Sequence, residues 1–176
     1  MKYLSIEKTS VANGVGIRTV LWVSGCSLHC KGCHNPESWD FNAGKPFDEN
    51  AMKELMNCLS KPYINGLTIS GGHPLENNNL STVFSIISNV KAFEPTKDIW
   101  LYTGLNLEYN DFVFSNPKNR YDMFKYNVLT YCDVVVDGEF REELRDTTLA
   151  FRGSSNQRLI DVKKTIKNKS IVLYTR

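Results

Sequence analysis

Short apolar runs alternate along this chain with longer segments in which apolar residues recur at helical spacing. Four of the runs are rich in β-branched residues, and each ends next to a glycine. Runs of this length and composition are typical of buried strands. We therefore predict strands over residues 17–24, 66–70, 98–103 and 133–137.

Two segments between these runs have the spacing of amphipathic helices. Asp48 is a residue type that favours helix N-caps, and the apolar residues after it fall at i, i+3, i+4 and i+7: Met52, Leu55, Met56 and Leu59. Pro62 limits this helix. The second helix has an apolar stripe made of Leu80, Val83, Phe84, Ile87 and Val90.

The second half of the chain gives weaker signals. Scattered aromatic residues surround Pro117 between Leu105 and Asn127, and we expect two short helical pieces that break at this proline. We interpret these aromatic residues as local core rather than as a docking face. Residues 139–145 are expected to be helical, and residues 171–174 to add a last short strand.

Strands that alternate with helices indicate βαβ units around a parallel sheet with right-handed crossovers. The predicted fold class is therefore α/β, with residues 1–176 in a single domain. Ligands of parallel sheets bind at the carboxyl ends of the strands, where a glycine lets the backbone approach a bound molecule. The glycines after the four strands suit such a site, although beginning a turn is an alternative role for each of them.

The composition fits one globular domain, and the charge balance reduces the classes of function to consider. The chain has 176 residues, of which 41% are hydrophobic and 23% charged. Lysine and arginine number 21 against 19 aspartate and glutamate, with no run of five like charges, so bulk charge does not support nucleic-acid binding. The N-terminal residues lack the apolar core of a secretion signal, and no stretch approaches the roughly 18 apolar residues of a membrane span. We expect a cytoplasmic protein.

The five cysteines are unevenly distributed. Thiols stay reduced in the cytoplasm, so we expect no disulfide framework. Cys58 and Cys132 stand alone and are interpreted as packing residues, because free cysteine behaves as a small buried hydrophobe. Cys26, Cys30 and Cys33 directly follow the first predicted strand, so one loop would present three thiolates at the carboxyl edge of the sheet.

Three thiolates on one loop suit an incomplete metal site. A [4Fe-4S] cluster held by four cysteines has every iron coordinated, whereas three cysteines leave one iron open to another ligand. A structural zinc ion is the alternative, with His29 or His34 as the fourth ligand. Spacing alone favours the cluster and leaves both open.

Two motifs resemble those of the radical S-adenosylmethionine superfamily. The spacing Cys26-x3-Cys30-x2-Cys33 is similar to its cluster-binding motif. Residues 68–75, TISGGHPL, resemble the glycine-glycine-acid-proline segment that holds the methionine part of the cofactor.

Further segments narrow the resemblance to one family. They are NGVGIR at 13–18, DIWLYTG at 98–104, VVDGEF at 135–140 and RGSSNQ at 152–157. Together these segments, spread over most of residues 1–158, resemble the family of anaerobic ribonucleoside-triphosphate reductase-activating proteins. The chain departs from the family pattern at Val15, where proline is usual, at His73, where an acid is usual, and in a longer stretch between Leu105 and Asn127.

The resemblance implies a partial, open parallel β/α barrel of the radical S-adenosylmethionine type. The implied cofactors are a [4Fe-4S] cluster and S-adenosyl-L-methionine. The implied cluster ligands are Cys26, Cys30 and Cys33. The residues expected to contact S-adenosylmethionine are Gly32, Cys33, His34, Gly71 and Gly72.

The implied reaction makes a radical on another protein. An electron from the reduced cluster cleaves S-adenosylmethionine, and the resulting 5′-deoxyadenosyl radical removes a hydrogen atom from a glycine Cα. That glycine belongs to the large subunit of anaerobic ribonucleoside-triphosphate reductase. An electron donor such as a flavodoxin is the second implied partner, and neither nucleic acid nor a membrane takes part. Residues 151–157 either line the opening for the partner or form a polar closing loop.

Alternatives remain for both the protein and one residue. The chain could activate another glycyl-radical enzyme such as pyruvate formate-lyase, or be a non-catalytic, zinc-stabilised binding module. His73 either accepts a hydrogen bond from the amino group of the cofactor or points away, with backbone carbonyls beside Gly71 and Gly72 in that role.

Overall fold

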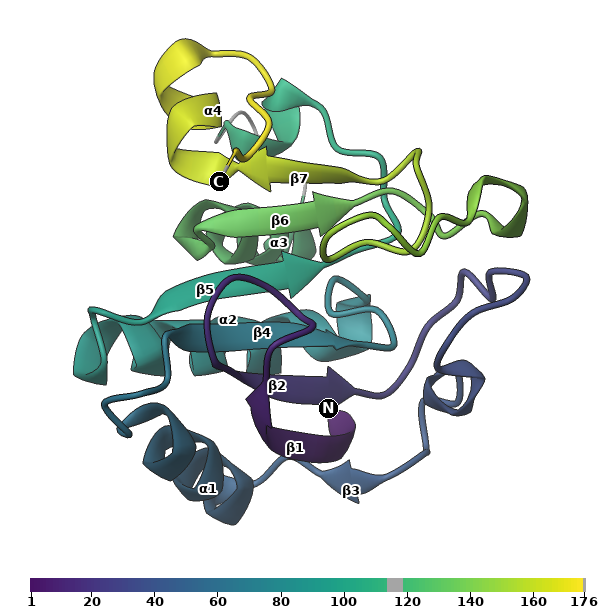
Figure 1. The fold of residues 1–176 in the computed structure, drawn as a ribbon. Coiled ribbons are helices and arrows are strands. Elements are labelled where there is room, and N and C mark those ends of the chain that lie inside the picture. Colours follow the sequence, from purple (N-terminus) through teal and green to yellow (C-terminus); the bar gives the residue numbers. More distant parts are fainter. Residues whose placement is uncertain (114–118, 176) are drawn as a thin grey trace.

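The computed structural model describes residues 1–113 and 119–175, which form one seven-stranded sheet with the order β3-β1-β2-β4-β5-β6-β7 (Figure 1). The strands are β1 Lys2–Ser10, β2 Arg18–Val23, β3 Lys45–Pro46, β4 Gly66–Gly71, β5 Asp98–Tyr102, β6 Val134–Asp137 and β7 Arg158–Asp161. Strands β2, β4, β5 and β6 are parallel neighbours, whereas β1, β3 and β7 pair with antiparallel neighbours. The fold is mixed α/β with a partly parallel sheet.

The four predicted strands are confirmed as β2, β4, β5 and β6. The predicted parallel sheet is confirmed in part, because β2, β4, β5 and β6 are parallel while β1 and β7 flank them with antiparallel pairs. Strand β1 escaped prediction because only Tyr3 and Ser10 among its residues are buried, which leaves no apolar alternation to detect.

The four helices of the described residues are α1 Glu49–Leu59, α2 Asn77–Phe93, α3 Arg120–Tyr131 and α4 Val162–Asn168. Asp48 is the N-cap of α1 as predicted, since its side chain accepts hydrogen bonds from the N–H groups of Asn50 and Ala51. Helices α2 and α3 lie behind the sheet in Figure 1, and α1 shares their buried core. No helix among the described residues is long and apolar enough to cross a membrane.

The second half of the chain differs from prediction in three places. One 3-10 turn, Tyr109–Phe112, and helix α3 stand where two short helices were expected, and the break at Pro117 lies outside the described residues. The helix predicted over 139–145 is only a 3-10 turn, Glu142–Leu144, because the backbone there bonds to Ser154 instead. The strand predicted over 171–174 is a single bridge, between Ile160 and Leu173.

The predicted aromatic core between Tyr109 and Tyr126 is confirmed in part. Phe112 is buried, and Phe124 lies 5.7 Å from Phe84 of α2 between ring centroids. Tyr121 is exposed.

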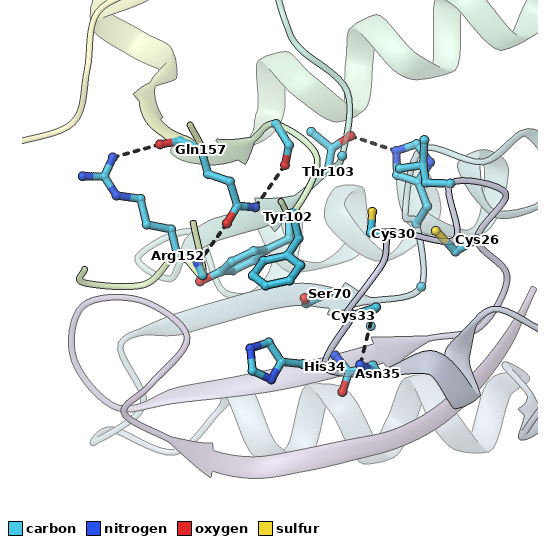
Figure 2. A pocket seen from close by; sticks show the side chains of 18 of the residues that line it. Cys26, Cys30, Cys33, His34, Asn35, Ser70, Tyr102, Thr103, Arg152 and Gln157 are labelled. Atoms are coloured by element: carbon cyan, nitrogen blue, oxygen red, sulfur yellow. Dashed lines mark hydrogen bonds between the residues drawn. The ribbon is translucent and has the colours of Figure 1, made fainter. Parts of the chain in front are cut away.

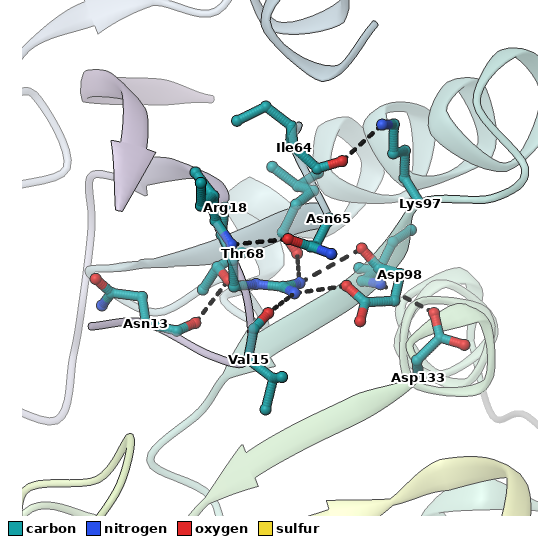
Figure 3. A network of polar contacts seen from close by, with 12 residues as sticks. Asn13, Val15, Arg18, Ile64, Asn65, Thr68, Lys97, Asp98 and Asp133 are labelled. Carbon is teal, nitrogen blue, oxygen red and sulfur yellow. Dashed lines mark hydrogen bonds and ion pairs between the residues drawn. The ribbon is translucent and has the colours of Figure 1, made fainter. Parts of the chain in front are cut away.

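The sheet face opposite α2 and α3 is covered by the N-terminal loop, residues 11–17 (Figure 1). Arg18, fully buried at the start of β2, holds this loop to the sheet (Figure 3). Its guanidinium donates to the hydroxyl oxygen of Thr68 (2.7 Å) and to the carbonyls of Val15 (3.1 Å) and Leu67 (2.8 Å). It also pairs with Asp98 at 2.6 Å. The covered face therefore holds a buried charged group beside an apolar cluster around Trp100.

Candidate functional site

A cavity of about 480 Å³ opens at the carboxyl ends of the four parallel strands. The loop after β2 supplies one wall, and the residues that follow β4, β5 and β6 supply the floor. Figure 2 shows Cys26 and Cys30 on one side of this cavity and Arg152 and Gln157 on the other. The site therefore lies where the arrangement of strands and glycines predicted it.

All three predicted cluster cysteines line this cavity. Cys26 is buried, whereas Cys30 and Cys33 are half-buried, and all three are free thiols. The loop turns tightly between the last two, where the N–H of Cys33 donates to the carbonyl of Cys30 at 3.1 Å. Gly32 adopts φ +74° in this turn, a left-handed conformation that favours glycine.

A single metal ion and an iron-sulfur cluster require different arrangements of the three thiols. Among residues 1–113 and 119–175, no group of three or more His, Cys, Asp or Glu side chains is placed to hold a metal ion. A zinc site needs its ligands around a single point, whereas the cysteines of a cluster each bind a different iron. The two candidate zinc histidines are exposed and lie against aromatic rings, His29 on Trp39 (4.8 Å) and His34 near Phe140 (5.7 Å).

Two of the three loop thiols, Cys26 and Cys30, ionise less readily than a free cysteine. Burial raises the pKa of Cys26, and it raises the pKa of Cys30 to about 11. Binding of a metal group to these thiolates must therefore release protons.

Unpartnered donors at the cavity fit a bound group that brings acceptors. The indole Nε1 of Trp39 and the Nε of Arg152 are buried without a hydrogen-bond partner among the described residues, and both side chains line the cavity. Buried donors are normally satisfied in folded proteins. Together with three thiols on one loop, this donor set fits an iron-sulfur cluster and a polar cofactor.

The residues expected to contact S-adenosylmethionine are not all in one place. Cys33, His34, Gly71 and Gly72 line the cavity. Gly32 is exposed and does not line it; a Cβ there would lie 3.2 Å from the carboxyl group of Glu142.

Gly71 and Gly72 have a packing role that the sequence did not show. A Cβ on Gly72 would lie 2.6 Å from the carbonyl oxygen of Gly25, and a Cβ on Gly71 would lie 2.7 Å from that of Val23. Gly71 also has φ +103°. The two glycines therefore let the end of β4 pack directly on the start of the cysteine loop.

His73 is buried, with 5% of its surface exposed, and both ring nitrogens have partners. Nε2 lies 2.8 Å from the hydroxyl oxygen of Thr103, and Nδ1 lies 3.3 Å from Oε1 of Glu76. Burial lowers the pKa of the imidazole, while Glu76 acts in the opposite direction. Sequence reasoning missed Thr103 and Glu76, although the spacing of His73 and Glu76 across the start of a helix was the available signal.

The wall opposite the cysteines is built by the segment 151–157. The side-chain oxygen of Gln157 accepts from the N–H groups of Gly153 (2.8 Å) and Ser154 (3.2 Å), and its amide nitrogen donates to the carbonyl of Gly138 (3.0 Å). Arg152 donates to the carbonyl of Gln157 at 2.9 Å. Arg152, Gly153 and Gln157 line the cavity, so this segment is part of the site wall.

Comparison with known proteins gives consistent matches. A family model described as a 4Fe-4S single cluster domain matches residues 12–160. Proteins named anaerobic ribonucleoside-triphosphate reductase-activating protein are similar along nearly their whole length. The one from Haemophilus influenzae is 41% identical over 159 residues, which cover 89% of this chain and 96% of the relative.

Two further relatives carry the same name. The protein of Enterobacteria phage T4 is 41% identical over 90% of this chain and 93% of its own length. That of Pasteurella multocida is 38% identical over 89% of this chain and 95% of its own. With the family model spanning most of the chain, these matches show that the chain belongs to the family of anaerobic ribonucleoside-triphosphate reductase-activating proteins.

Proposed function

We propose that this protein is an enzyme that activates anaerobic ribonucleoside-triphosphate reductase by generating a glycyl radical on its large subunit. The observation that carries the proposal is the set of three free thiols on one loop, facing a cavity at the carboxyl ends of the parallel strands. The 4Fe-4S family match over residues 12–160 and the names of the relatives support it.

In this proposal Cys26, Cys30 and Cys33 hold a [4Fe-4S] cluster, and one iron stays open for S-adenosyl-L-methionine. Backbone groups of Cys33 and His34, beside the turn at Gly32, contact that cofactor. Its methionine end would lie along Gly71 and Gly72, which line the cavity and whose lack of side chains lets β4 pack closely on the cysteine loop.

When bound, the cluster and S-adenosylmethionine supply the one-electron chemistry that creates the radical. The protein itself positions the bound groups and shields them from water. Trp39 and Arg152 have donors free for a bound acceptor. Tyr102 is fixed by donating its hydroxyl to the carbonyl of Phe151 at 2.7 Å, and both side chains wall the cavity, which helps to exclude water.

We further propose that the sheet is the open, partial β/α barrel of radical S-adenosylmethionine enzymes, in a single domain of residues 1–176. The four parallel strands with α1 and α2 as crossovers support this, as do the edge positions of β3 and β7. An opening between the cysteine loop and the segment 151–157 would admit a peptide of the reductase.

The proposal includes reduction by a donor such as a flavodoxin, because the chemistry consumes an electron. It also places the protein in the cytoplasm, where free thiols such as the five cysteines of this chain stay reduced.

The test is to purify the protein without oxygen, analyse iron and sulfide, and mix it with reductant, S-adenosylmethionine and the reductase. The reductase carries deuterium on its glycine residues. We expect a glycyl radical on the reductase by electron paramagnetic resonance and deuterium in the 5′-deoxyadenosine. Stoichiometric zinc without iron would indicate a binding module. In a parallel reaction with pyruvate formate-lyase labelled in the same way, transfer from that enzyme alone would indicate the other activase.

A further inference from the structure

The segment that follows β4, residues 72–79, makes several hydrogen bonds to the cysteine loop, residues 24–33. The proposed chemistry does not use these contacts. The backbone N–H of Gly72 donates to the carbonyl of Val23, the last residue of β2, at 2.8 Å. The backbone N–H of His73 donates to the carbonyl of Gly25, also at 2.8 Å. The buried side chain of Asn79, in α2, donates to the carbonyl of Ser24 at 2.9 Å. These contacts fix the chain before the first cysteine.

Glu76 adds hydrogen bonds to the residue that follows the first cysteine. Its Oε1 accepts from both the N–H (2.9 Å) and the hydroxyl (2.6 Å) of Ser27, the residue after Cys26. Glu76 is the N-cap of α2, yet its side chain makes no capping hydrogen bond to that helix. The carboxylate is therefore directed to the cysteine loop rather than to its own helix.

His73 holds Glu76 in turn. A carboxylate only accepts hydrogen bonds, so Nδ1 of His73 must carry the hydrogen that points at Glu76. Nε2 bonds to Thr103, whose hydroxyl oxygen also accepts from the N–H of Leu105 at 3.2 Å. Both ring nitrogens are engaged in either protonation state, so neither is left to meet a cofactor. An acid at position 73 would set two carboxylates side by side.

We propose that Thr103, His73 and Glu76 form a hydrogen-bonded relay that orients Ser27 and, through it, the cysteine loop. His73 and Glu76 are thus positioning residues and not cofactor ligands. The inference rests on the proposed function in one respect only: it takes Cys26, Cys30 and Cys33 as the cluster ligands.

Two substitutions of His73 distinguish its contact with Glu76 from its contact with Thr103. His73→Asn keeps an amide donor near the position of Nδ1, whereas His73→Gln places its amide near the position of Nε2 and loses the contact with Glu76. We measure amide hydrogen exchange over residues 25–28 and alkylation of the loop thiols in the metal-free protein. We expect about tenfold faster exchange in His73→Gln and Glu76→Ala, and a smaller increase in His73→Asn, which keeps the contact with Glu76 but loses the one with Thr103.

Two further variants complete the design. Combining His73→Gln with Glu76→Ala should add little to Glu76→Ala alone, because both act on one contact. Ser27→Ala changes an exposed side chain and should cost little overall stability. It should speed exchange about threefold, because the N–H of residue 27 can still donate to Glu76. Asp133→Asn changes a partly buried carboxylate away from the cavity, so any faster exchange that it shares with the other variants reflects lower overall stability and not the loop contact.

Equal exchange in His73→Asn and His73→Gln, or unchanged exchange in Glu76→Ala, would overturn the relay. The readout needs neither iron nor S-adenosylmethionine, so its result is separate from that of the proposed function. A relay that is present in a protein unable to assemble a cluster would count against the proposed function alone.

Discussion

At the scale of single residues, the cysteines fall into two groups by surroundings rather than by exposure. Cys26, Cys30 and Cys33 share one cavity. Cys58 is buried at the end of α1, and Cys132 is buried with its thiol donating to the carbonyl of Val128 at 3.1 Å. The isolated cysteines therefore pack as predicted.

Alanine substitutions should separate the two groups. Replacing Cys26, Cys30 or Cys33 should abolish iron incorporation and cleavage of S-adenosylmethionine, because two thiolates cannot hold the cluster. Cys58→Ala and Cys132→Ala should keep both, with a stability loss of about 1 kcal/mol from the lost buried sulfur. Iron content and 5′-deoxyadenosine formation are the measurements. Loss of iron in Cys58→Ala without unfolding would contradict the assignment.

Elements are joined in this fold by a few buried polar groups. Arg18 ties the N-terminal loop to β2, β4 and β5 (Figure 3). Asp133, before β6, accepts from the N–H of Ile99 (2.9 Å) and pairs with Lys91 of α2 (2.8 Å) and Lys163 of α4 (2.7 Å). Each residue bridges segments far apart in sequence, so its loss should be felt in several elements.

Arg18→Met should lower the free energy of unfolding by about 3 kcal/mol, because it leaves buried acceptors of Thr68 and Leu67 unpaired. Asp98→Asn should cost only about 1 kcal/mol, because an amide oxygen can still accept from Arg18 and the other hydrogen bonds of the guanidinium remain. Urea unfolding of both variants gives the comparison. Equal losses would show that the ion pair, and not the hydrogen bonds, dominates.

Stability should depend on pH through Asp133. Partial burial alone would raise the pKa of this carboxyl group, but hydrogen bonds from Lys163, Lys91 and the N–H of Ile99 hold it below its ordinary value. A lowered folded-state pKa contributes stability above the unfolded pKa of about 3.9 and loses it as pH falls through the folded value.

Asp133→Asn should therefore destabilise the protein by about 2 kcal/mol near neutral pH. The difference between the two proteins should shrink below about pH 4. Urea unfolding at several pH values measures it. A difference that stays constant with pH would show that the ionised form of Asp133 contributes nothing.

On the scale of the whole molecule, one core connects most elements. Buried residues from β1 to α4 form one hydrophobic cluster on the helical face of the sheet, and a smaller cluster around Trp100 lies under the segment 151–157. Among residues 1–113 and 119–175, neither half of the sheet has a core of its own.

The chain should consequently unfold in one transition. Far-ultraviolet circular dichroism reports the helices, and tryptophan fluorescence reports Trp100 and the two other tryptophans. The two signals should change at the same urea concentration in metal-free protein. Two separated transitions would show independent units and contradict the single domain.

The sequence by itself determined the elements and the chemistry that depend on local pattern. The runs at β2, β4, β5 and β6 and the stripes of α1 and α2 follow from periodicity, which short segments carry in themselves. The cysteine spacing likewise placed three thiols on one loop at the carboxyl edge of the sheet, and they meet at the cavity there.

Only the tertiary structure decided which distant residues meet. Strand β1 has little apolar alternation and forms because β2 offers a partner, while residues 139–145 fail to form a helix because their backbone bonds to Ser154. Three features have no signal in the local sequence: the burial of Arg18, the packing of Gly72 on Gly25, and the hydrogen bonds that link Thr103 to Ser27. Each depends on contacts between segments that are far apart in the chain, and folding alone brings these together.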